Sequence, residues 1–190
     1  MKKILSFILI LSLTALLFCS CGSKKVSDYT AEIVIKDYGT ITLHLDGDTA
    51  PITVSNFVKL AESGFYDGLT FHRIMEGFMM QGGDPLGNGT GGSEETIKGE
   101  FSDNGVKNNV KHKKGVLSMV LPDGKDSANG EFFIVTETLK ELDGKSTAFG
   151  KITDMSILEK ILNDLEPDEN GEIPAEDRPK ITSISLHGHH

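Results

Sequence analysis

The positions of the two cysteines most constrain what this chain can fold into. Cys19 and Cys21 lie at the end of an N-terminal apolar run, and the rest of the 190 residues contain no cysteine. No disulfide can therefore stabilise the part that follows, which must fold on a hydrophobic core alone. A chain of this length is long enough for one domain with such a core, and two independent domains are not expected.

Residues 1–20 have the architecture of a secretory signal peptide. Two lysines precede an apolar run over residues 4–18, which is shorter than the roughly 20 residues needed to cross a bilayer. A serine, Cys21 and Gly22 follow, and this order resembles the processing site of bacterial lipoproteins, in which the cysteine becomes the lipidated first residue. We expect Cys21 to carry a lipid and residues 21–28 to form a tether on the outer side of the bacterial cell membrane. An ordinary cleaved leader and a retained helix remain the alternatives.

The charge balance argues against a nucleic-acid partner. The chain has 19 basic and 28 acidic side chains and a net charge of −9. Proteins that bind nucleic acid concentrate Lys and Arg on one face, and this composition leaves few cations for such a face. Nothing in the sequence predicts an oligomer, so we expect a monomer.

Residues 29–187 read as one domain of strands with two helices. Residues 31–36 and 40–45 alternate polar and apolar side chains around a turn, which predicts two paired strands. Residues 69–135 are rich in glycine and short apolar runs, so we expect short strands joined by long loops. Residues 180–186 read as a closing strand.

Two helices are predicted from the spacing of apolar residues. The first has Pro51 in its first turn, with Asp48 or Thr49 as its cap, and ends near Gly64. The second begins after Asp154 as a cap and carries an apolar stripe to Leu165. Between the second helix and the last strand, the acidic residues 168–172 favour a solvated turn over a calcium loop. Residues 188–190 read as a histidine-containing tail, either native or added in cloning.

The segment from residue 71 to residue 84 carries the chemistry. If residues 71–74 and 78–81 form neighbouring strands, Arg73 and Gln81 share one face with Met79. This places a guanidinium beside an apolar floor, with an amide nearby as an acceptor. The alternative is an arginine that backbone carbonyl groups lock in place.

This segment resembles the cyclophilin family, and the resemblance extends from about Tyr29 to Leu186. Phe71-His72-Arg73-Ile74 and Gly77-Phe78-Met79-Met80-Gln81-Gly82-Gly83-Asp84 are similar to the motif of that family. Further matches follow in the same order: Asn88-Gly89-Thr90-Gly91-Gly92, Gly115-Val116-Leu117-Ser118-Met119, Phe132-Phe133-Ile134, Leu142-Asp143-Gly144-Lys145 and Phe149-Gly150-Lys151. The fold this implies is mainly β, a closed eight-stranded antiparallel β-barrel capped by two α-helices.

The resemblance implies a peptidyl-prolyl cis/trans isomerase that assists the folding of exported proteins. Arg73 would hydrogen-bond the prolyl carbonyl, and Gln81 would orient Arg73. Such a reaction rotates a bond and breaks none, so no cofactor or metal is expected. The proline-containing segment would meet these residues: Phe78, Met79, Gly89, Val120, Glu131, Phe133, Leu142 and Ser146.

Three single positions depart from the family pattern, and Val120-Leu121-Pro122 replaces the Ala-Asn-Ala stretch of the family. Glu131 stands where the family usually has Gln, and its carboxylate could pair with Arg73 and compete with substrate. Ser146 replaces a His, and Glu141 replaces a frequent Trp, so we expect weak binding of cyclosporin. These departures support an alternative function, a catalytically weak module that binds proline-containing peptides as a tethered chaperone. A transport-associated solute-binding lipoprotein would need a longer chain of alternating strands and helices.

Overall fold

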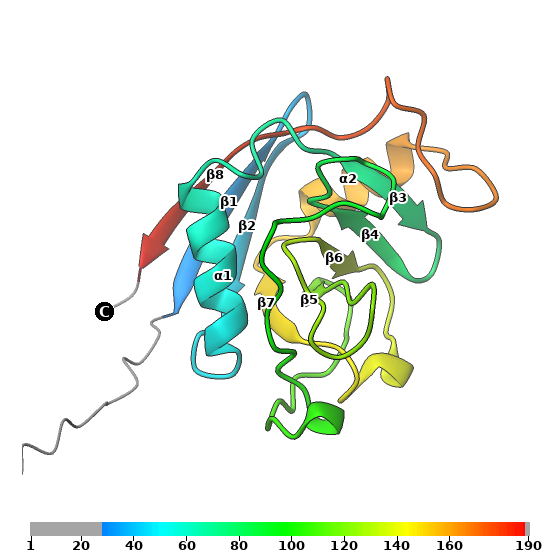
Figure 1. Ribbon diagram of the computed structural model, residues 1–190. Coiled ribbons are helices and arrows are strands. Elements are labelled where there is room, and N and C mark those ends of the chain that lie inside the picture. The colour runs from blue at the N-terminus through cyan, green and yellow to red at the C-terminus, as the bar shows by residue number, and fades with distance from the viewer. Residues whose placement is uncertain (1–27, 189–190) are drawn as a thin grey trace, which may run out of the picture.

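Eight strands and two α-helices make up residues 28–188, the part of the chain that the computed structural model describes (Figure 1). The predicted signal peptide, lipidated cysteine and most of the tether lie outside these residues, as do the last two tail residues. No helix within the described range is long and apolar enough to cross a membrane. In chain order the elements are β1 (Tyr29–Ile35), β2 (Gly39–Leu45), α1 (Pro51–Glu62), β3 (Phe71–Met75), β4 (Met79–Gly82), η1 (Ser102–Asn104), β5 (Val116–Met119), β6 (Phe132–Val135), η2 (Lys140–Leu142), β7 (Ala148–Ile152), α2 (Ser156–Asp164) and β8 (Ile181–Gly188).

The first two strands form a hairpin because apolar and polar residues alternate along both of them. Ile33 pairs with Ile41 and Ala31 pairs with Leu43, so the apolar side chains of both strands are buried on the same side. Gly39 begins β2 with φ at 121°, a backbone conformation that favours glycine. The predicted strand, turn and strand are confirmed.

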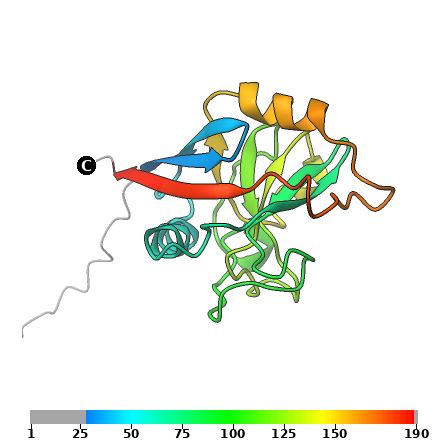
Figure 2. The same cartoon turned by 90° about the horizontal axis from the view of Figure 1, so that it is seen from above.

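All eight strands join one antiparallel sheet in the order β3-β4-β6-β5-β7-β2-β1-β8. The sheet curls strongly, and its two end strands approach each other (Figure 2). The fold is thus mainly β with two helices, as expected, but it is a curled half-barrel. The closed barrel that we expected is wrong, because within residues 28–188 no ladder joins β3 to β8.

The loop that precedes β8 explains why the sheet stays open. Residues of this loop occupy the outer edge of β3: Ile74 N donates to the carbonyl of Gly171 at 2.8 Å. Those backbone groups of β3 are therefore already paired and cannot form a ladder with β8. Beyond the loop, an isolated bridge between Thr70 and Lys180 connects the two edges.

Packed aromatic rings fill the core that the sheet and α1 enclose. Phe57 of α1 contacts Tyr66, Phe132 and Phe149 with ring centroids 5.1, 5.7 and 5.5 Å apart. The Tyr66 hydroxyl, which is buried, donates to the carbonyl of Gly130 at 2.9 Å. Burying a large apolar side chain contributes roughly 1.5–3 kcal/mol, so this core can stabilise the domain without a disulfide.

α1 is capped in a way that the sequence did not predict. Ala50 occupies the cap position, so the predicted cap from Asp48 or Thr49 is wrong. The carboxylate of Glu100, from the long loop between β4 and β5, accepts hydrogen bonds from backbone N–H groups of the first turn instead. The helix ends at Glu62, close to the predicted end.

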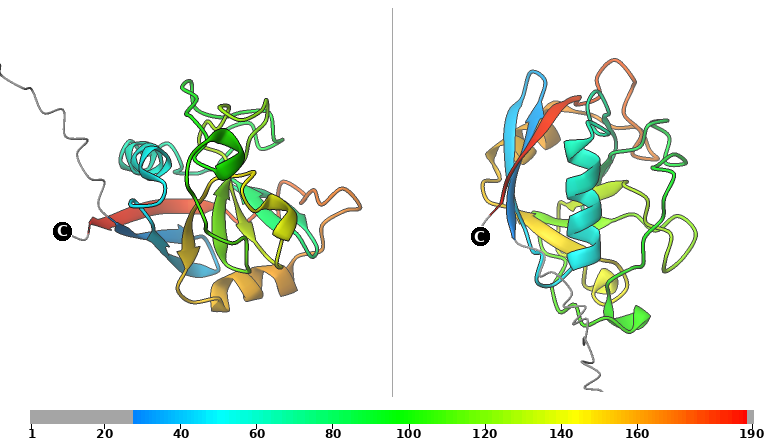
Figure 3. Two further views of the ribbon diagram at one scale, coloured as in Figure 1. Left: turned by 90° about the horizontal axis from the view of Figure 1, so that it is seen from below. Right: turned by 60° about the vertical axis from the view of Figure 1, so that its left-hand side comes forward.

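α2 lies on the side of the sheet opposite α1 (Figures 2 and 3). It begins at Ser156 with Met155 at the cap position, so the predicted cap at Asp154 is wrong by one residue, although the Asp154 carboxylate accepts from Ser156 N at 3.0 Å. Leu158 and Ile161 are fully buried, which confirms the apolar stripe as a core face.

Candidate active site

β3 and β4 place Arg73 and Gln81 directly opposite each other. The two residues are partners in the antiparallel ladder, and Met75 faces Met79 two positions along. Because residues two apart on a strand point to the same face, all four side chains share one face. The predicted pairing of these strands is confirmed, and it sets a guanidinium beside apolar side chains.

The apolar side chains predicted to hold the proline gather in one cluster, separate from the main core. Met79 and Phe133 are two of its buried members, on the paired strands β4 and β6. Phe78, Val120 and Leu142 pack against them and are half-buried. The structure therefore brings together five of the eight residues that the sequence predicted to contact substrate.

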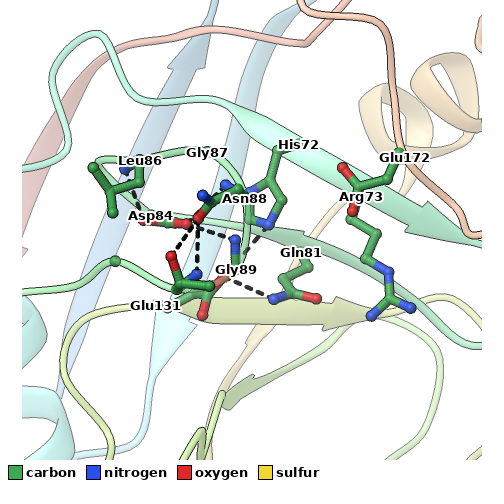
Figure 4. Close-up of polar contacts among 12 residues, drawn as sticks. His72, Arg73, Gln81, Asp84, Leu86, Gly87, Asn88, Gly89, Glu131 and Glu172 are labelled. Carbon is green, nitrogen blue, oxygen red and sulfur yellow. Dashed lines mark hydrogen bonds and ion pairs between the residues drawn. The ribbon is translucent and has the colours of Figure 1, made fainter.

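Arg73 is anchored at one nitrogen and open at the other two. Its Nε donates to the carbonyl of Asn170 at 3.0 Å, while its two terminal nitrogens have no protein partner within residues 28–188. The alternative that backbone carbonyl groups lock Arg73 in place is therefore met at Nε and not at the two terminal nitrogens. Figure 4 shows the guanidinium pointing away from Glu172, with the amide oxygen of Gln81 turned toward it. The terminal N–H groups can meet a carbonyl of a bound peptide.

Glu131 binds the side-chain amide of Gln81 from the protein interior. Gln81 Nε2 donates to Glu131 Oε1 at 2.7 Å, and no hydrogen bond joins the side chains of Gln81 and Arg73 in the described part of the chain. Glu131 is fully buried, so direct contact between Glu131 and substrate, which we predicted, is wrong. Burial raises the pKa of Glu131 to about 7. The predicted ion pair of Glu131 with Arg73 is also absent from residues 28–188.

Ser146 turns its hydroxyl inward, into a chain of buried polar groups. Its Oγ donates to the carbonyl of Met119 at 2.9 Å and lies 2.9 Å from Ser118 Oγ. His112 follows, with Nε2 3.1 Å from Ser118 Oγ and Nδ1 3.2 Å from an Asp143 oxygen. Burial lowers the pKa of His112, although Asp143 opposes this shift. Ser118 is fully buried, so this Ser-His-Asp order has no access for a nucleophilic reaction; it positions Ser146.

Gly89 brings the loop after β4 up to the site. Its N–H donates to Asp84 Oδ2 at 2.6 Å, and a β-carbon at this position would lie 3.8 Å from Gln81 Nε2. The Asp84 carboxylate also accepts hydrogen bonds from the N–H groups of Leu86 and Asn88. Asp84 therefore fixes the loop against Gln81.

Sequence reasoning assigned no role to His72 and Asp84, which are both buried beside Gln81 and Glu131. Alternation along the strand could not place His72, because the register of β3 against β4 shifts between Phe71 and Arg73. The burial of Asp84 depends on the loop and could not be read from the strand pattern. Elsewhere on the surface, two hollows of 560 and 880 Å³ include neither Arg73 nor Gln81.

Comparison with known proteins places the chain in a family. The family model described as cyclophilin type peptidyl-prolyl cis-trans isomerase/CLD matches residues 30–186. The chain belongs to this family. A peptidyl-prolyl cis-trans isomerase of Helicobacter pylori (strain J99) is 48% identical over 136 residues, which cover 70% of this chain and 81% of that protein. Peptidyl-prolyl cis-trans isomerase B of Bacillus subtilis (strain 168) is 48% identical over 124 residues, 65% of this chain and 83% of that protein.

Solved cyclophilins have the same fold. A cyclophilin-type isomerase of Cryptosporidium parvum, crystallised in the presence of the dipeptide Ala-Pro, superposes with a TM-score of 0.74 at 28% identity. The superposition covers 84% of this chain and 99% of that one. The family and its relatives agree on one activity, so this cyclophilin is a peptidyl-prolyl cis/trans isomerase.

Proposed function

We propose that this cyclophilin isomerises Xaa-Pro bonds of exported proteins, with Arg73 as the catalytic group, and that a lipid on Cys21 anchors it outside the cytoplasm. The observation that carries the catalytic part is the position of Arg73. Its terminal nitrogens have no protein partner among residues 28–188, and it shares a face with the apolar cluster around Met79 and Phe133. A proline ring on that cluster would leave its carbonyl within reach of a guanidinium.

The reaction needs a lower torsional barrier and no bond cleavage. Rotation about a peptide bond meets a barrier of about 18–20 kcal/mol because the C–N bond has double-bond character. We propose that Arg73 donates to the prolyl carbonyl and favours a pyramidal prolyl nitrogen, which reduces resonance as the bond twists. A hydrogen bond to a charged group contributes roughly 1.5–3 kcal/mol, or about 10- to 100-fold in rate if it forms mainly in the transition state.

The rest of the acceleration would come from holding one half of the peptide. Met79, Phe133, Phe78 and Leu142 are available as the apolar surface for the proline ring, because they lie together and the last two are half-buried. The presence of Ala-Pro with the Cryptosporidium parvum relative supports a proline-containing peptide as ligand. Gln81 would act on Arg73 through its amide oxygen, since its amide nitrogen is bound to Glu131.

An exchange measurement tests the role of Arg73. Residues 23–190 would be mixed with an Xaa-Pro peptide, and cis/trans exchange would be followed by protease-free NMR. We expect Arg73→Ala to lower kcat/KM about 10- to 100-fold while peptide binding changes less. Lys59→Ala, which removes an exposed cation on α1, is the matched control and should keep full activity.

The same measurement separates catalysis from binding alone. If the unmodified protein binds the peptide without faster exchange, the alternative of a tethered peptide-binding chaperone takes the place of the isomerase. If exchange is fast and Arg73→Ala leaves it fast, the isomerase stands and the role of Arg73 is wrong.

The anchor is tested by fractionation. The apolar run and the Ser-Cys-Gly order that follows support lipidation of Cys21 and an extracytoplasmic location. Cys21→Ala should release the protein from the membrane fraction. Unchanged membrane retention of the variant would contradict the lipid anchor.

A further inference from the structure

Three buried side chains that can bind a metal meet behind the active-site face. His72 comes from β3, Asp84 follows β4, and Glu131 precedes β6. One ligand atom of each lies within 4.8 Å of the others. The residues are 1%, 1% and 0% exposed, so solvent does not satisfy them. Figure 4 shows all three directed at one another around Gly89.

His72 points into this cluster without a hydrogen-bond partner. Neither of its ring nitrogens is bonded; Nε2 lies 3.5 Å from Glu131 Oε1, without the geometry of a hydrogen bond. Glu131 Oε2 is unpartnered as well. A buried polar atom without a hydrogen-bond partner destabilises the folded state, so such atoms are rare in proteins. Two of the three residues thus carry buried atoms without a hydrogen-bond partner, and the ring of His72 faces the carboxylate of Glu131.

The charge of the cluster points to a cation. Two carboxylates lie close together in the interior, and in the described part of the chain no Lys or Arg forms an ion pair with either of them. Buried charges in proteins are paired or coordinate metals. Both oxygens of Asp84 accept N–H groups of its loop, whereas Glu131 accepts only the amide of Gln81 on Oε1 and nothing on Oε2.

We propose that His72, Asp84 and Glu131 bind a first-row divalent metal ion, with Zn²⁺ as the preferred one. One imidazole nitrogen and two carboxylate oxygens are ligands that Zn²⁺ accepts, and a water would complete four-fold coordination. Ligand atoms around Zn²⁺ lie roughly 3.4 Å apart, so side-chain rotations must draw the ligand atoms together by up to about 1.4 Å. The isomerase reaction does not need this metal, and the proposal stands independently of the proposed function.

The site would act on catalysis through Gln81. Glu131 uses Oε1 for the amide of Gln81 and leaves Oε2 for the metal, so both contacts can exist together. Gly89, bonded to Asp84, lies beside the same amide nitrogen of Gln81 (Figure 4). A bound ion would therefore tie Glu131 and the Asp84 loop into one rigid support beneath Gln81.

Metal binding can be measured without any isomerase assay. The full chain, solubilised in mild detergent and stripped of metal, would carry His187→Ala, His189→Ala and His190→Ala to remove the imidazoles of the tail. Calorimetry with Zn²⁺ should give one site per chain, and Co²⁺ should produce visible d–d absorption. Zn²⁺ should also raise the Tm.

Two ligand variants and one control decide the outcome. Glu131→Gln removes the charge, keeps the shape and still accepts from Gln81; His72→Gln removes the imidazole. Each should weaken Zn²⁺ binding at least 10-fold and lose the Tm increase, while far-UV circular dichroism confirms the fold. Glu159→Gln, an exposed carboxylate on α2, should bind as the starting protein does. No binding by the starting protein, or an unchanged affinity in either folded ligand variant, overturns the proposal.

Discussion

Glu100 should be among the most stabilising charged residues of this domain, because it caps a helix that lies far from it in the sequence. Its Oε1 accepts from Ile52 N at 3.0 Å, and its Oε2 accepts from Thr53 N at 2.8 Å and from Thr53 Oγ1 at 2.7 Å. Thr53 is buried, so water cannot replace these bonds without opening the structure. The carboxylate also lies at the positive end of the α1 dipole.

The magnitude follows from the groups left without partners. Glu100→Ala removes the acceptor of two buried donors on Thr53 and of one donor on Ile52, which is 44% exposed and can be hydrated. At roughly 1–3 kcal/mol for an unsatisfied buried group, and with relaxation of the loop, the expected loss is about 3 kcal/mol. Glu100→Gln should lose nearly as much stability. One of the two acceptor oxygens becomes an NH₂ group, which would face a backbone N–H donor.

Urea unfolding measures this loss. The chain contains no Trp, so far-UV circular dichroism must report the transition. With a urea m-value of about 1–3 kcal/mol per M, the midpoint of Glu100→Ala should fall by about 1–3 M. Glu159→Gln removes an exposed carboxylate that pairs with Lys114 at 3.0 Å, and it should change stability by less than about 1 kcal/mol. Equal midpoints for Glu100→Ala and Glu159→Gln would refute the argument.

Two further predictions concern pH and ligand choice. Burial lowers the pKa of His112 in the folded state. The neutral imidazole therefore contributes its full share of the free energy of unfolding above the unfolded pKa of about 6.5, and this contribution is lost as the pH falls below that value. The difference in urea midpoint between the unmodified protein and His112→Gln should therefore shrink from pH 8 to pH 5, and a constant difference would contradict this. Cyclosporin should bind weakly because Glu141 stands at the position of the frequent family Trp; Glu141→Trp should tighten binding at least 10-fold, measured by calorimetry, and an unchanged affinity would show that this position is not responsible.

Local patterns were sufficient to predict the strands and the apolar part of the site. Alternation along residues 31–45 determines which faces are buried, and the pairing of β3 with β4 follows from two short apolar runs around Glu76-Gly77. Arg73, Gln81 and Met79 share a face because a strand has a period of two. These predictions needed no knowledge of distant residues.

Contacts between distant residues could not be predicted in the same way. The cap of α1 comes from Glu100, 48 residues from Ile52, so the local cap signal at Asp48 and Thr49 was misleading. The closed barrel was wrong because Gly171 and its neighbours hydrogen-bond to the edge of β3. An acidic turn that reads as solvated in the sequence therefore controls how far the sheet can close.

The burial of Glu131 changes what its departure from the family pattern means. In the sequence, a carboxylate in place of the usual Gln suggested an ion pair with Arg73 and a weakened site. In the structure Glu131 is fully buried, bonds to Gln81 and leaves the terminal nitrogens of Arg73 without a protein partner among residues 28–188. The departure at Glu131 therefore acts on the support of the site, and Arg73, Gln81, Met79 and Phe133 keep the residue types of the family motifs. This argues for an active isomerase whose rate depends on what occupies the space beside Glu131, over a module that only binds.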